Sequence, residues 1–136
     1  MRNSNIRSAL VQGYLAAGLA HPTAYENTKF DQPTDTPWCS VFILPNQPRV
    51  ASLGIGGTDE HTGIMQVDVN YPTESGMQDI LADVDAVADY FTAGRRLVYN
   101  AQEVIVRSCG RSPGRKVDGW YRISLTIDWY AQTPRS

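Results

Sequence analysis

The sequence predicts an α+β domain in which two helices pack on one face of a mainly antiparallel or mixed sheet of about five strands. Two segments repeat apolar residues at spacings of three and four, as one face of a helix requires. Other segments alternate apolar and polar residues, as a half-buried strand requires. A chain of 136 residues fits one core, so we expect a single domain over residues 1–136.

The first helix is expected over residues 4–19. Asn3 or Ser4 is suited to cap its start, because a short polar side chain accepts from the free N–H groups of the first turn. Gly18 is expected to end it. Its buried stripe consists of Ile6, Leu10, Tyr14 and Ala17.

Three segments then follow before the next strong pattern. Residues 23–27 are expected to form a short edge strand. Residues 38–45 hold a continuous apolar run, which predicts a central strand buried on both faces. Residues 46–60 are rich in turn residues and glycine, which predicts a long, mobile connection.

The segment 61–72 shows the most regular strand pattern. Its alternate residues Met65, Val67, Val69 and Tyr71 are expected to anchor the sheet beneath the helices. The residues between them, Gln66, Asp68 and Asn70, are expected to face solvent or a neighbouring molecule.

The second helix is expected over residues 75–91, with Thr73 or Ser75 as its cap and Gly94 after its end. Its buried stripe consists of Ile80, Val84, Val87 and Phe91. Two long strands, 100–108 and 119–131, complete the sheet, and a glycine- and arginine-rich hairpin loop, 109–119, joins them.

Charge is distributed unevenly along the chain. Residues 59–89 hold eight acids and no Lys or Arg, a sum of −8, whereas residues 95–122 hold seven bases and two acids, a sum of +5. One interpretation is two solvated faces that partly neutralise each other within one fold. The other is two complementary patches that meet between copies of the protein.

No catalytic or metal-binding pattern is evident in the sequence. His61 and Cys39 are the candidates for a nucleophile and its base, but such a pair needs spatial contact that a sequence does not reveal. CxxC, HxH and HxxxH spacings are absent, so we expect no metal, no cofactor and no enzymatic activity. The longest apolar run, 41–44, is far below the ~20 residues of a membrane helix, so no membrane partner is expected.

The loop 109–119 carries three bases, Arg111, Arg115 and Lys116, among glycines. A solvated hairpin tip, a protein contact and a nucleic-acid contact are all compatible with this composition. The chain as a whole is acidic, with a pI near 5.6, which disfavours nucleic acid.

An ordered set of short strings resembles the tail terminator-like (minor tail) proteins of long-tailed bacteriophages. The strings are the IRSAL helix, TAYEN at 23–27, P-W-x-S-V-x-x-L-P at 37–45, G-I-x-Q-V-D-V-x-Y-P at 63–72 and G-W-Y-R-x-x-x-x-I-x-W-Y at 119–130. The resemblance covers almost the whole chain.

This resemblance implies a structural virion protein that is assembled in the host cytoplasm. Such proteins form a ring, six-membered where known, that caps the tail tube, stops tube polymerisation and provides the surface for head attachment. The implied partners are the protein itself, the tail-tube protein and a head-completion or connector protein. DNA passes through the lumen without specific recognition.

Two sets of residues are expected to make these contacts. A subunit interface is expected to join the acids of the second helix to nearby arginines, which are Asp79, Asp83, Asp85, Asp89, Arg95, Arg96 and Arg107. Axial contacts are expected from the loops 46–60 and 109–119, and Arg111, Arg115 and Lys116 are the residues that test this expectation. The alternatives are a head–tail joining or neck protein and, with less support, a small-ligand-binding module.

Overall fold

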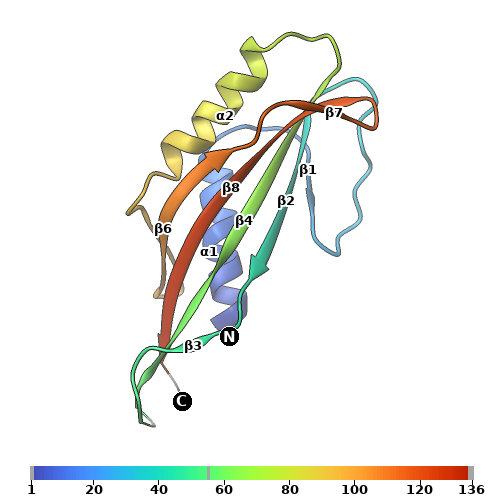
Figure 1. Ribbon diagram of the computed structural model, residues 1–136. Helices are drawn as coiled ribbons and strands as arrows, with labels where there is room; N and C mark the ends of the chain where they lie inside the picture. Colours follow the sequence, from blue (N-terminus) through green and yellow to red (C-terminus); the bar gives the residue numbers. More distant parts are fainter. Residues whose placement is uncertain (1, 55, 135–136) are drawn as a thin grey trace.

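The computed structural model describes residues 2–54 and 56–134, which form one curved, mixed sheet with both helices on one face (Figure 1). The helices are α1 (Arg2–Ala16) and α2 (Gln78–Tyr90). The strands are β1 (Thr23–Tyr25), β2 (Trp38–Pro45), β3 (Arg49–Val50), β4 (Thr58–Pro72), β5 (Arg96–Tyr99), β6 (Gln102–Arg111), β7 (Arg115–Val117) and β8 (Trp120–Pro134).

The strand order confirms the α+β class and the mixed sheet. The main path runs β1-β2-β4-β8-β6-β5, while β3 pairs with β4 and β7 pairs with β8. Strand β1 runs parallel to β2, and the other pairs of the described residues are antiparallel. The expected edge strand near residues 23–27 is therefore confirmed as β1.

The core lies between the helices and the central pair of strands, β4 and β8. Met65 lies opposite Ile127 and Val67 lies opposite Leu125, and all four side chains are buried. The helical stripes cover this surface, and the stripe residues Ile6, Leu10, Tyr14, Ile80, Val84, Val87 and Phe91 are buried. Helix spacing and strand alternation thus identify the residues of one common core.

Both expected helix caps are wrong. Helix α1 already includes Arg2, so Asn3 and Ser4 lie within its first turn rather than before it. Helix α2 begins at Gln78 because the preceding residues form a turn, in which the Ser75 hydroxyl donates to the Pro72 carbonyl oxygen at 2.6 Å. Thr73 and Ser75 therefore lie too early to cap it.

The expectation that residues 38–45 form a central strand holds only for the first half of the strand. Strand β2 lies next to the edge strand β1, which pairs with it only as far as Val41. Beyond that point β2 is itself the sheet edge, and the Leu44 side chain there is 48% exposed. An apolar run in sequence does not reveal how long the neighbouring strand is.

The segment 46–60 is more regular than the mobile connection that its composition predicts. Strand β3 pairs with the start of β4, where Arg49 lies opposite Glu60. We call residues 46–60, apart from residue 55, which lies outside the described residues, the arm. Figure 1 shows that the arm extends past the N-terminal end of α1, away from the helices.

The polar face of β4 does not face solvent along its whole length. Asp68 and Asn70 are 5% and 0% exposed, contrary to the expectation from alternation. The Ser124 hydroxyl donates to Asp68 at 2.6 Å, and the Arg122 guanidinium donates to Asn70 at 2.6 Å. An aromatic group of Phe30, Trp38 and Trp120 covers the same end of the sheet.

Candidate interaction surfaces

Helix α2 presents three exposed carboxylates and one that is engaged within the chain. Asp79, Asp85 and Asp89 are exposed. Asp83 points inward, where His21 Nε2 donates to its Oδ2 at 2.8 Å and the Tyr71 hydroxyl donates to the same oxygen. Burial, followed by the Asp83 hydrogen bond, raises the pKa of Tyr71. Asp83 therefore ties α2 to the segment after α1.

The three arginines expected at the subunit interface all have contacts within their own chain. Arg95 stacks on the Tyr90 ring at 4.3 Å, and its Nε donates to the Tyr90 carbonyl oxygen. Arg96 lies 3.5 Å from Glu103, and Arg107 lies 3.9 Å from Glu60. Both arginines are exposed and their partners Glu60 and Glu103 are partly exposed, so each ion pair contributes about 0–1 kcal/mol and leaves its arginine able to exchange partners.

A β-bulge determines the direction of the Arg107 side chain. On β6, Val106 lies opposite Trp129 and Ser108 lies opposite Asp128, so Arg107 is the extra residue between two paired ones. Its guanidinium lies 4.7 Å from the centre of the Tyr130 ring. The bulge thus places this cation on the face of the sheet away from the helices, whereas Arg95 follows the end of α2.

The basic loop 109–119 is largely part of the sheet. Arg115 belongs to β7, and its guanidinium donates to the hydroxyls of Ser112 and Ser124 at 3.0 and 2.9 Å. Arg111, at the end of β6, and Lys116 are exposed. Arg115 thus holds the loop against the sheet, whereas Arg111 and Lys116 present their charges to solvent.

The candidate catalytic residues do not form a catalytic pair. The Cys39 thiol is fully buried, and burial raises its pKa to about 12, so it is a protonated thiol at neutral pH. His61 Nε2 is hydrogen-bonded to the Thr133 hydroxyl at 2.9 Å, and burial lowers the His61 pKa. Within residues 2–54 and 56–134, no three His, Cys, Asp or Glu side chains are arranged to hold a metal ion. Neither described helix is long and apolar enough to cross a bilayer.

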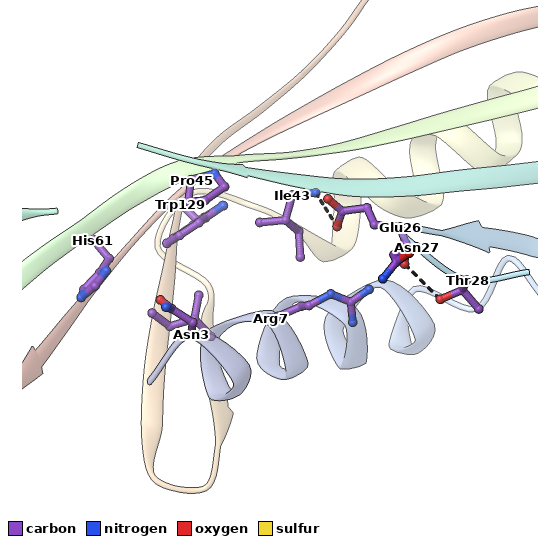
Figure 2. Close-up of a pocket in the computed structure, with 10 residues that line it drawn as sticks. Asn3, Arg7, Glu26, Asn27, Thr28, Ile43, Pro45, His61 and Trp129 are labelled. Carbon is purple, nitrogen blue, oxygen red and sulfur yellow. Dashed lines mark hydrogen bonds between the residues drawn. The ribbon is translucent and has the colours of Figure 1, made fainter. Parts of the chain in front are cut away.

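A groove of about 530 Å³ lies between the first two turns of α1 and the free edge of β2 (Figure 2). Its apolar lining comes from Ile6 on α1, Ile43 on β2 and Trp129 on β8. Arg7 and Glu26 line it from opposite sides, and Figure 2 shows Arg7 reaching toward the Glu26 end. Sequence patterns did not identify this groove, because its residues come from five separate segments of the chain.

The arm carries the two most exposed aliphatic side chains of the described residues. Val50 is 63% exposed and Leu53 is 91% exposed. The arm backbone is nevertheless hydrogen-bonded, since the Ala51 and Ser52 amides both donate to the Thr58 carbonyl oxygen at 3.0 and 3.1 Å. The glycine-rich composition of residues 46–60 is typical of loops, so the sequence did not predict a hydrogen-bonded hairpin there.

The comparisons with known proteins agree with this architecture. A family model described as phage tail terminator protein matches residues 5–129. One similar solved structure, whose title names no function, has a TM-score of 0.72 and 19% identity over 96% of this chain and 93% of its own. A chain from the virion of a native gene transfer agent particle has a TM-score of 0.62 and 18% identity, with coverage of 96% and 97%. No curated protein matches the chain significantly. The chain therefore belongs to the phage tail terminator protein family, whose members are structural proteins of phage tails.

Proposed function

We propose that copies of this chain close into a six-membered ring that caps the tail tube, stops tube polymerisation and provides the surface for head attachment. The observation that carries the proposal is the family match over residues 5–129, together with a fold that agrees over 96% of the chain. Assembly takes place in the host cytoplasm. DNA passes through the ring without specific recognition.

The subunit boundary includes a charged contact. The exposed acids Asp79, Asp85 and Asp89 of one copy face Arg95, Arg96 and Arg107 of the next. Asp83, the fourth acid of the original set, acts indirectly by fixing the position of α2. The exposed ion pairs Arg96–Glu103 and Arg107–Glu60 give way to contacts between copies.

Axial contacts come from Arg111 and Lys116, which are exposed at the β6–β7 end of the sheet. Arg115 supports them by holding the loop on Ser112 and Ser124. These bases meet the tail-tube protein or the head-completion protein, since recognition usually depends on segments that a rigid sheet positions.

The decisive experiment adds the purified chain to its cognate tail-tube protein during tube assembly. Electron microscopy is expected to show tubes of restricted length with a ring at one end. Binding to a portal-side connector instead of the tube protein would favour the head–tail joining alternative. Unrestricted tube growth without end binding would refute the terminator function.

Salt tests the charged contact separately. Light scattering after size-exclusion chromatography is expected to show a ring that dissociates more readily at 1 M salt than at 0.1 M, because the Debye length falls from about 10 to 3 Å. A ring whose stability does not change with salt would refute the charged interface without refuting the terminator function.

A further inference from the structure

We infer that the arm of one copy docks in the α1–β2 groove of the next copy, with Val50 and Leu53 as its apolar anchors. This inference rests on the ring proposed above and identifies its principal contact. It requires two unlike surfaces on each copy, as a head-to-tail ring does.

The first observation is that the arm is hydrogen-bonded to β4 but leaves the side chains of Val50 and Leu53 uncovered. Pairing with β4 fixes the backbone at Arg49 and Val50, and hydrogen bonds to Thr58 close the hairpin toward its tip. An ordered hairpin that presents an aliphatic side chain at 91% exposure gains nothing from that side chain within its own fold. Such an anchor contributes about 1.5–3 kcal/mol when a partner buries it.

The second observation is that the chain leaves the groove incomplete. The indole of Trp129 is 2% exposed and lines the groove, yet its Nε1–H has no hydrogen-bond partner among the described residues. A buried indole N–H usually finds a partner. The isolated chain therefore supplies an apolar lining for the groove and leaves this indole N–H unpaired, as it also does at Trp38 outside the groove.

The groove also selects the way in which an occupant binds. The β2 edge is open beyond Val41, but Glu26 Oε1 accepts from the Ile43 amide at 3.1 Å, and Pro45 has no N–H (Figure 2). The strand edge is thus blocked against pairing with an added strand. An occupant binds through apolar side chains, which is what the arm presents.

Several features favour a second copy as the occupant. Among its described residues each chain carries both a projecting apolar hairpin and this groove, and the arm leads away from the helices, so it does not fill its own groove (Figure 1). Arg49, the charged residue of segment 46–54, complements the Glu26 carboxylate at the groove. A volume of about 530 Å³ lies within the roughly 300–1,000 Å³ of ordinary binding pockets and accommodates two aliphatic side chains.

The first test measures ring stability in the Leu53→Ser variant by light scattering over a dilution series. The concentration at half-dissociation is expected to rise at least about tenfold, with the thermal midpoint of the subunit unchanged. Leu15→Ser is the matched control, because Leu15 is 54% exposed at the opposite end of α1. Equal stability of the two variant rings would overturn the inference.

The second test uses cross-linking in a Cys109→Ser background, in which only buried Cys39 remains. A chain with both Asn3→Cys and Leu53→Cys, treated with a short bismaleimide, is expected to give a ladder up to the ring size. Leu53→Cys alone is expected to stay uncross-linked. Dimers of that single variant would reveal an arm–arm contact, and cross-links only to added tail-tube protein would assign the arm to the tube. Either result overturns the inference.

Failure of this inference is distinguishable from failure of the proposed function. If the wild-type ring caps tubes but the Asn3→Cys, Leu53→Cys chain gives no ladder, the arm–groove contact is refuted and the terminator function stands. If neither rings nor capped tubes form with the cognate tube protein, the function fails and the inference fails with it.

Discussion

Asp83 and Asp85 are two residues apart on the same helix but lie in opposite environments. Asp83 accepts hydrogen bonds from His21 and Tyr71, whereas Asp85 is exposed to solvent. The sequence identified both as acids beside the buried stripe of α2. It did not separate them, because the partners of Asp83 lie 12 and 62 residues away along the chain.

Replacing Asp83 by Ala is expected to lower the free energy of unfolding by about 1–3 kcal/mol, since the partly buried Tyr71 hydroxyl loses its acceptor. Asp85→Ala changes helix propensity by the same amount and is expected to stay within about 0.5 kcal/mol of wild type. Urea unfolding of both variants measures the difference. Equal stabilities of the two variants would show that the hydrogen bonds of Asp83 make no net contribution to the free energy of unfolding.

At the scale of elements, long patterns were predictable and short ones were not. The alternation in 61–72 and 119–131 predicted β4 and β8, which hold the core. Strands β3, β5 and β7 have two to four residues, too few to show a period. They exist because a longer neighbour provides the hydrogen-bonding edge, which is a tertiary effect.

The turn between β5 and β6 contains a strained residue. Tyr99 pairs with Gln102, so Asn100 and Ala101 form a two-residue hairpin turn, with φ of 48° and 65°. Such turns require positive φ at both positions, which Asn tolerates and Ala does not.

Ala101→Gly is therefore expected to raise the free energy of unfolding by up to about 1 kcal/mol. Glycine removes the steric strain of the left-handed backbone conformation, and this relief exceeds the entropy that the more flexible glycine loses on folding. Ala82→Gly, at an exposed position within α2, is the matched control and is expected to lower it by about 0.5–1 kcal/mol. Thermal unfolding of the two variants should show shifts of opposite sign. Shifts of the same sign would contradict the turn assignment.

At the scale of the whole molecule, the family resemblance in the sequence pointed to the correct protein family, while the candidate surfaces required the fold. Arg7, Ile43 and Trp129 share a groove only because α1, β2 and β8 converge there. Charge counting found unlike patches along the sequence. It did not reveal that several of the charges already have partners within the chain.

The polarity of the arm–groove contact makes a prediction about mixed assemblies. Leu53→Ser weakens the arm and leaves the groove intact, whereas Asn3→Trp is expected to fill the groove and leave the arm intact. At a concentration at which the wild-type ring is stable but the variant rings dissociate, each variant alone should be monomeric. In an equimolar mixture, the intact arm of an Asn3→Trp subunit binds the intact groove of a Leu53→Ser subunit. The remaining arm and the remaining groove of this pair are both defective, so a third subunit gains no strong contact.

The mixture is therefore expected to form dimers that do not grow into rings, which sedimentation velocity distinguishes from monomer and from ring. A control mixture of wild type with Leu15→Ser should form full rings. Full rings from the two defective variants would show that closure depends on surfaces other than the arm and the groove. Assembly is expected to stop at the dimer because the contact is head-to-tail: in a closed ring every subunit must insert its arm into one neighbour and receive the arm of the other.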